Sequence, residues 1–175
     1  MILGAVLAGG QSSRFGSDKA LAEIEGQTLL ARAVDTLAGW CDHVVVVGRA
    51  AAPAPTLPDW PRPGMGPLAG LAGALRLAAD EGYATVLTCG VDSPGLADDL
   101  PDVLGMAPAC VRSQPIVGVW PIESLPALEA LLHDEPPHAV YRFAETIGAR
   151  LVDVARQPAN INTPADLASF SRKAT

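Results

Sequence analysis

The sequence predicts an α/β fold: a three-layer, doubly wound sandwich in which helices cover both faces of a mostly parallel sheet. Strand-like and helix-like segments alternate along the chain, which is typical of this class. Three almost continuously apolar runs, at residues 2–8, 43–47 and 84–89, have the length of strands that are buried on both faces. Helical patterns lie between them, as crossover connections between parallel strands require.

The helices and shorter pieces have local signals of their own. Thr28 can cap a helix whose apolar side chains recur at helical spacing from Leu29 to Trp40. Before it, residues 21–25 predict a short extended piece that ends in a turn. Thr163-Pro164-Ala165-Asp166 opens a C-terminal helix with a cap, a first-turn proline and an acidic residue. The other expected elements are helices at 68–79, 97–104, 125–133 and 139–148 and strands at 110–112, 115–120 and 151–154.

Composition excludes several classes of protein. We find no internal repeat, so residues 1–175 are expected to form one domain. A net charge of −7 and a pI of about 4.8 argue against a nucleic-acid or anionic-membrane partner. The three cysteines are too few for a disulfide framework and are expected to be free thiols in a cytoplasmic protein. We expect no signal peptide, because Met1 leads directly into the first predicted strand, and no apolar stretch is long enough to span a membrane.

The loop after the first strand is the most informative segment. Leu7-Ala8-Gly9-Gly10 ends the strand, and the loop then carries Arg14 and closes on Lys19. Glycines let a backbone come close to a polyphosphate, while N–H groups and cations stabilise its charge. Neither the Gly-Lys-Ser/Thr ending of a P-loop nor a Gly-x-Gly-x-x-Gly fingerprint is present. The alternative is a tight turn with two solvated cations.

A carboxylate follows the third apolar strand. Asp92 can hold Mg²⁺, which keeps several waters and bridges one or two carboxylates to substrate phosphates. A turn aspartate before Ser93-Pro94 is the alternative. Ligands of open α/β sheets bind outside the carboxyl ends of the strands, so we expect this loop to meet the loops at 9–19 and 59–70.

The stretch at 50–67 has no periodic pattern, and long loops of this kind are usually functional. Within it, Asp59 could accept hydrogen bonds from a base or a ribose, or be an ordinary exposed carboxylate. Gly66-Pro67-Leu68-Ala69-Gly70 opens the next helix with small residues. Their size would let a flat ring or a ribose approach the backbone, and tight packing against the sheet would also require it.

Nothing in the sequence predicts covalent catalysis. His43 precedes a strand, His133 ends a helix and His138 follows two prolines, so all three are expected to be structural or exposed. Without an evident nucleophile, direct transfer between two bound substrates is favoured.

Together these motifs resemble the molybdenum cofactor guanylyltransferases, the MobA family, over nearly the whole chain. The segment from Leu7 to Lys19 matches the opening signature, which many nucleotidyltransferases share. Gly66 to Gly70 matches the central motif, with Asp59 upstream, and Asp92 falls where the family has its magnesium aspartate. Two further segments correspond: Gln114-Pro115 and Asn160-Ile161-Asn162-Thr163-Pro164.

The resemblance implies a Rossmann-like nucleotidyltransferase fold and a Mg-dependent guanylyltransferase. Such an enzyme transfers GMP from GTP to molybdenum-molybdopterin, forming the molybdopterin guanine dinucleotide cofactor and pyrophosphate. Transient contacts with molybdenum-insertion proteins and apo-molybdoenzymes would follow. A cytidylyltransferase or other nucleotidyltransferase with a different phosphorylated acceptor, and a non-catalytic nucleotide-binding adaptor for cofactor delivery, remain alternatives.

The same resemblance assigns expected roles to individual residues. Lys19, Arg14 and Asp92 would be catalytic, with Asp92 as the metal ligand, and Asn160 and Asn162 would bind the acceptor. The nucleotide would be bound by Leu7, Ala8, Gly9, Gly10, Lys19, Asp59, Gly66, Pro67, Gly70 and Asp92.

One residue and one short segment depart from the family pattern. Val47 stands where the family can place a nucleotide-contacting asparagine, so that contact is expected to be missing or moved to Arg49. Pro136-Pro137-His138 replaces a more basic segment, which is expected to change the acceptor pocket.

Overall fold

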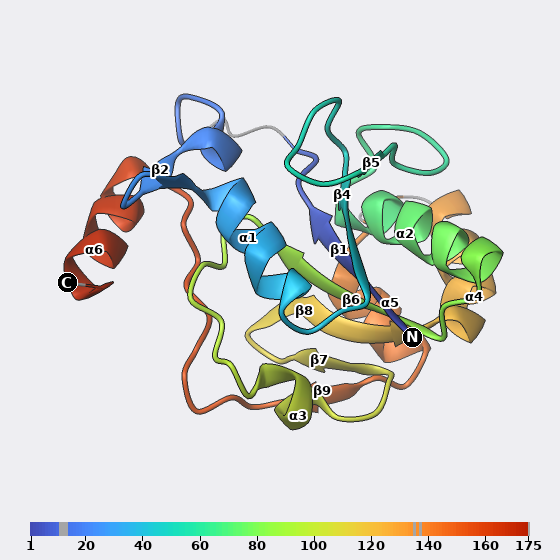
Figure 1. Cartoon of the computed structure of the whole chain (residues 1–175). Coiled ribbons are helices and arrows are strands. Elements are labelled where there is room, and N and C mark those ends of the chain that lie inside the picture. The colour runs from blue at the N-terminus through green and yellow to red at the C-terminus, as the bar shows by residue number, and fades with distance from the viewer. Residues whose placement is uncertain (11–13, 135, 137, 175) are drawn as a thin grey trace.

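A computed structural model, which describes residues 1–10, 14–134, 136 and 138–174, contains a seven-stranded sheet of order β5-β4-β1-β6-β8-β7-β9 (Figure 1). β1 pairs in parallel with β4 and with β6, whereas β8 is antiparallel to both β6 and β7. The predicted mostly parallel sheet is therefore confirmed. Its strands are β1 (Ile2–Leu7), β4 (His43–Val47), β5 (Thr56–Leu57), β6 (Thr85–Gly90), β7 (Ala109–Val111), β8 (Gln114–Pro121) and β9 (Arg150–Val152).

Helices cover both faces of the sheet, which gives the predicted three layers (Figure 1). One core contains side chains of α2, α4 and α5, and the other contains side chains of α1 and α3. The helices are α1 (Leu29–Ala38), α2 (Pro67–Glu81), α3 (Leu100–Leu104), α4 (Leu125–His133), α5 (Val140–Thr146) and α6 (Pro164–Ala174), with 3₁₀ turns η1 (Lys19–Leu21) and η2 (Ile122–Ser124) and a small hairpin of β2 (Glu23–Ile24) and β3 (Gln27–Thr28).

The first strand divides its side chains between the two cores, as a doubly covered strand must. Leu3 and Leu7 lie in the core of α2, while Val6 lies in the core of α1. Gly4 faces α1 so closely that a Cβ there would lie 3.2 Å from the Cβ of Leu37. The missing side chain at Gly4 therefore lets α1 pack closely against β1, the strand that leads into the loop at the site.

Two predicted helix caps are confirmed. The hydroxyl of Thr28 accepts a hydrogen bond from the N–H of Ala31 at 3.0 Å. At α6 the hydroxyl of Thr163 accepts from the N–H of Asp166 at 3.2 Å, and the Asp166 carboxylate accepts from the N–H groups of Asn162 and Thr163. This reciprocal cap holds the chain just before α6 in one conformation.

Some boundaries differ from the sequence prediction. The strand β5 was not expected, because it is two residues long and lies between prolines; it pairs in parallel with β4. Helix α2 is longer than predicted because Gly66 and Gly82, both with positive φ, mark its ends. Helix α3 begins only at Leu100. Within the described part of the chain, no helix is long and apolar enough to cross a membrane.

Candidate active site

Two adjoining pockets lie at the carboxyl edge of the sheet, where the loops after β1, β5 and β6 meet as expected. The larger has a volume of about 610 Å³ and the smaller about 220 Å³. Both are lined by Leu7, Gly9, Gly10 and Pro67, so the loop after β1 forms their shared wall. The larger pocket is further lined by Val47, Gly48, Asp59, Pro63, Gly64, Gly66 and Gly70, and the smaller by Ala8, Asp18, Lys19, Ala20, Gly90, Val91, Asp92 and Ile116.

The ends of β1 and β4 come very close together at the larger pocket, and we call this contact between Gly9 and Gly48 the backbone crossing. The N–H of Ala8 donates to the carbonyl of Val47 at 3.0 Å, which extends the β1–β4 pairing beyond the strand. Gly48 has a φ of 86°, and a Cβ there would lie 2.6 Å from the Cα of Gly9. A side chain at Gly48 would therefore push the two strand ends apart.

Asp59 stands above this crossing. Its Oδ2 would be 3.3 Å from a Cβ at Gly9, and its Oδ1 would be 3.4 Å from a Cβ at Gly70. Burial raises the pKa of Asp59 above its ordinary value of 3.8, because the ionised form loses contact with water. A Cβ at Gly70 would also lie 3.2 Å from Leu7 Cδ2, so Gly70 lets α2 pack closely against β1, in agreement with the packing explanation for this small residue.

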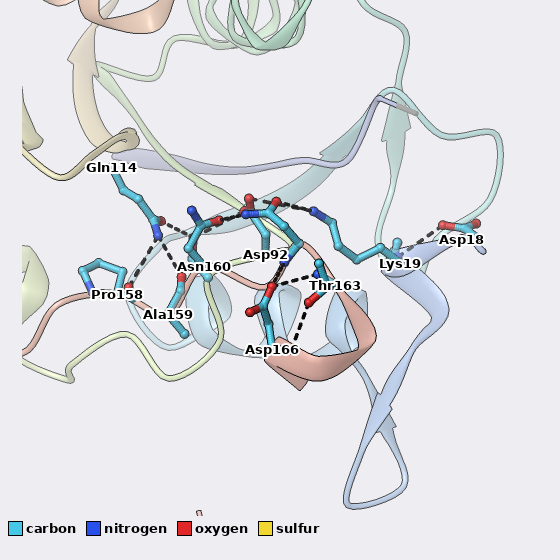
Figure 2. A network of polar contacts seen from close by, with 12 residues as sticks. Asp18, Lys19, Asp92, Gln114, Pro158, Ala159, Asn160, Thr163 and Asp166 are labelled. Atoms are coloured by element: carbon cyan, nitrogen blue, oxygen red, sulfur yellow. Dashed lines mark hydrogen bonds and ion pairs between the residues drawn. The ribbon is translucent and has the colours of Figure 1, made fainter. Parts of the chain in front are cut away.

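A cluster of polar side chains from three distant segments lies at the smaller pocket, and two of its members, Lys19 and Asp92, line that pocket (Figure 2). Lys19 Nζ lies 4.0 Å from Asp92 Oδ2 and donates to Asn162 Oδ1 at 3.5 Å. Asn162 in turn donates from its Nδ2 to Asn160 Oδ1 at 2.8 Å. The Lys19 and Asp92 side chains are only 17% and 29% exposed, so water screens their charges incompletely.

The two asparagines face the cluster because of the residue between them. Ile161 is buried in the core of α1, and its N–H donates to the Asp92 carbonyl at 2.8 Å. Alternate side chains of an extended segment point the same way, and the hydrogen bond between Asn160 and Asn162 agrees with both side chains lying on the side of Lys19, opposite Ile161. The cap of α6 fixes the segment from its other end by accepting the Asn162 N–H.

A second set of hydrogen bonds connects the segment before α6 to Asp92, through Gln114 and Ser93. Gln114, at the start of β8, donates from Nε2 to the Ala159 carbonyl at 2.8 Å and accepts from the Ser93 hydroxyl (Figure 2). Ser93 is buried and also lies 3.4 Å from Asp92 Oδ1. The carboxylate and the segment that carries the asparagines are therefore held in one hydrogen-bonded unit.

The loop after β1 is anchored by a bidentate ion pair. Arg49 donates to the two Asp18 carboxylate oxygens at 3.0 and 2.6 Å. The hydrogen bond from Arg49 is the main cause that lowers the pKa of Asp18. Asp18 also accepts from the N–H of Ala20, which sets the turn η1 in which Lys19 lies. The guanidinium that was expected to replace a nucleotide contact is thus paired with the loop.

Three further positions or segments were expected to matter at the site: Arg14, Val47 and residues 136–138. Arg14 is exposed and does not line either pocket. The pKa of Asp166 is lowered mainly by the hydrogen bond from the Asn162 N–H, and the charge of Arg14 makes a smaller contribution. Val47 is fully buried and lines the larger pocket as an apolar wall. Of Pro136-Pro137-His138, the middle residue lies outside the described residues; His138 bonds through Nε2 to the Asp134 carbonyl at 2.9 Å.

The smaller pocket is lined by a carboxylate, Asp92, that suits Mg²⁺ if further ligands come from water and phosphate. A Cβ at Gly90 would lie 2.5 Å from Asp92 Oδ1, so the missing side chain leaves space for this carboxylate at the pocket wall. Among the described residues no cluster of three metal-ligating side chains exists. Mg²⁺ suits such a site, because it uses one or two carboxylates and takes its other ligands from water and phosphate.

Sequence reasoning assigned no role to several residues that the structure places at the site, among them Gly48, Ser93, Pro63 and Gly64. Gly48 follows a predicted strand directly, as Gly9 does, and this parallel could have indicated it. Ser93 and the two loop residues carry no local signal, because their roles depend on contacts with distant segments.

Comparison with known proteins gives consistent matches. Residues 4–151 match the family model of the MobA-like NTP transferase domain. The molybdenum cofactor guanylyltransferase of Acidiphilium cryptum is 40% identical over 177 residues, which cover 93% of this chain and 90% of that protein. The molybdenum cofactor guanylyltransferase of Rhodobacter capsulatus is 34% identical and covers 95% of this chain and 93% of its own length.

Solved structures share the fold. The molybdopterin-guanine dinucleotide biosynthesis protein A of Archaeoglobus fulgidus superimposes with a TM-score of 0.72 at 19% identity, covering 99% of this chain and 98% of that chain. The 2-C-methyl-D-erythritol 4-phosphate cytidylyltransferase of Thermus thermophilus gives 0.68 at 18% identity, covering 98% and 100%. The fold is therefore that of the nucleotidyltransferases.

Proposed function

The chain belongs to the MobA-like NTP transferase family, and we propose that it transfers GMP from GTP to the phosphate of molybdenum-loaded molybdopterin, with release of pyrophosphate. The observation that supports this best is the cluster of Lys19, Asp92 and Asn162 beside a glycine-walled pocket. A cation and a carboxylate at one pocket suit a metal-bound polyphosphate, and the neighbouring pocket has room for a nucleoside.

The larger pocket would hold the guanosine. Gly9, Gly10 and Gly66 expose backbone to it, and Asp59 supplies a carboxylate that can accept hydrogen bonds. Guanine carries N–H donors on its ring and on its exocyclic amino group, and ribose carries hydroxyl donors. Asp59 is therefore placed to select a nucleoside by hydrogen bonding.

The smaller pocket would hold the reacting phosphates. A phosphate oxygen of the acceptor attacks the α-phosphorus of GTP in line; the new P–O bond forms as the bond to the β-phosphate oxygen breaks, and that electron pair leaves on pyrophosphate. Lys19 lies where it can stabilise the departing charge. The nucleophile is already an ionised phosphate oxygen, so no side chain has to remove a proton.

Positioning is what the remaining residues provide. Asn160 and Asn162 offer amide groups to the acceptor on the side of Lys19. Holding both substrates in reactive geometry replaces a bimolecular encounter by a nearly unimolecular step. Arg14 would add positive charge at the rim when substrate is bound.

Asp92 would hold Mg²⁺ through its carboxylate. A magnesium ion held there would supply neutralisation of phosphate charge.

The proposed function is tested by following the label from two forms of GTP. With molybdate-loaded molybdopterin and Mg²⁺, α-labelled GTP should place its label in a pterin dinucleotide, and γ-labelled GTP should release labelled pyrophosphate. CTP, ATP and UTP should transfer poorly. Transfer from CTP in preference to GTP would overturn the base assignment. GTP binding with neither transfer of the α-label to the pterin nor release of the γ-label in pyrophosphate would support the non-catalytic adaptor.

A further inference from the structure

The segment that carries Asp59 lies directly along helix α2. The Pro58 carbonyl oxygen would be only 2.7 Å from a Cβ at Gly73, and the N–H of Trp60 donates to the Ala69 carbonyl at 2.9 Å. Asp59 lies between these two contacts. The position of its carboxylate in the pocket therefore depends on how firmly residues 58–60 are held against the helix.

The Trp60 side chain is held from two other directions. The guanidinium carbon of Arg76, on α2, lies 4.6 Å from the centroid of the indole ring. His133, at the end of α4, meets the same ring edge-on with a centroid distance of 6.3 Å. Arg76 is fixed in turn, because its Nη1 pairs with Glu129 Oε1 at 2.6 Å. Cation–π stacking and the ion pair thus connect the Asp59 segment to two helices.

These side chains do not take part in the pockets. Among the described residues that line the two pockets of the site, Trp60, Arg76, Glu129 and His133 are absent. An effect on substrate binding would therefore have to be indirect, and Asp59, the neighbour of Trp60 in the chain, is the polar side chain through which it would act.

We propose that Trp60, Arg76 and Glu129 form a strut that positions Asp59 for nucleoside recognition. They are positioning residues, and the proposal rests on the proposed function of the larger pocket. Because Asp59, the neighbour of Trp60, lines the larger pocket and not the smaller one, loss of the strut should weaken nucleotide binding and leave the transfer step largely intact.

The test compares the Kd of GTP, by calorimetry, with kcat at saturating GTP. Trp60→Ala should raise the Kd about tenfold, the scale of a lost aromatic and cation–π contact, while kcat changes less than about threefold. Trp60→Phe keeps a ring for Arg76 and should restore most of the affinity. Arg76→Lys keeps the charge but loses the flat stacking face, so an intermediate Kd is expected.

A matched control is the exposed ion pair of Arg112 and Asp153, at the opposite end of the sheet. Arg112→Ala should leave the Kd of GTP unchanged. A Trp60→Ala protein with the wild-type Kd overturns the strut and leaves the proposed function standing. If Trp60→Ala does not fold, Arg76→Lys decides, because an unchanged Kd in that variant overturns the strut. A wild-type protein that binds no GTP overturns both proposals.

Discussion

The two halves of the site are built by different means. On the phosphate side, Lys19 and Asp92 line one pocket, and Asn162, from the segment before α6, is hydrogen-bonded to Lys19. On the nucleoside side, the walls are mostly glycine and backbone, with the single carboxylate of Asp59. A polyphosphate requires placed charge, whereas a nucleoside requires a shaped cavity and a few hydrogen-bonding groups. We therefore expect the phosphate side to control turnover and the nucleoside side to control affinity.

The pKa values of two carboxylates, Asp18 and Asp59, also differ between the two sides. Asp18, beside Arg49, has a lowered pKa because it accepts two hydrogen bonds from the guanidinium. Asp59 has a raised pKa because it is buried. The loop of the phosphate side is thus stabilised by an ionised pair, whereas the nucleoside side contains a carboxylate whose charge is not favoured by its surroundings.

The largest effect is expected on the phosphate side. Asp92→Asn should lower kcat at least about 100-fold, the scale on which an electrostatic stabiliser of the transition state acts. The variant keeps the shape of the side chain and removes its charge. Steady-state pyrophosphate release over a range of Mg²⁺ concentrations measures the effect. Near-normal turnover at limiting Mg²⁺ would remove Asp92 from the metal site.

Lys19→Ala should affect binding and turnover together, because the cation would contact both the ground-state triphosphate and the departing pyrophosphate. We expect about a tenfold loss in GTP affinity, as for a charged hydrogen bond, and a further loss in kcat. Lys19→Arg, which keeps the charge, serves as the control. A change in neither parameter would make Lys19 a residue of structure only.

Gly48→Ala tests the backbone crossing on the nucleoside side. The added Cβ would meet Gly9 at 2.6 Å and would also require a φ of 86°, so the variant should unfold at a lower temperature and bind GTP more weakly. Gly82→Ala is the matched control, since Gly82 has a φ of 80° with nothing within 4 Å of its Cβ position. That variant should lose about 1 kcal/mol of stability or somewhat more, for backbone strain alone, and keep its GTP affinity. Equal effects at both positions would show that the crossing does not shape the pocket.

The smallest effect concerns pH. Asp59 can accept hydrogen bonds through both carboxylate oxygens when it is ionised, whereas protonation turns one of them into a donor. GTP affinity should therefore fall as the pH falls through its raised pKa, above 3.8. Because folding favours the protonated form, the ionised carboxylate lowers stability at neutral pH, and Asp59→Asn should raise the melting temperature slightly. Calorimetry of the wild type and Asp59→Asn across acidic pH measures this. A pH dependence that persists in Asp59→Asn would assign it to another group.

Local signals explain which parts the sequence predicted. The apolar run of β1, the Thr28 cap and the Thr163 cap each depend on neighbouring residues, and each was found where expected. The convergence of Asp59, Lys19 and Asp92 followed from topology, because parallel strands end at one edge.

Long-range contacts explain what the sequence did not predict. The crossing of Gly9 and Gly48, the pairing of Asp18 with Arg49 and the stacking of Trp60 on Arg76 join segments far apart in the chain. The strand β5 has two residues and is recognisable only by its pairing with β4. None of these contacts produces a recognisable pattern among residues that are neighbours in the sequence.

The division between the two sides is tested most directly by measuring GTP affinity and the single-turnover rate at saturating GTP in Asp92→Asn and Asp59→Asn side by side. Asp92→Asn should lose most of its rate while its GTP affinity without Mg²⁺ stays close to that of the wild type. Asp59→Asn should lose affinity while it keeps the wild-type rate. A slow single turnover in Asp59→Asn, or a normal one in Asp92→Asn, would contradict the account.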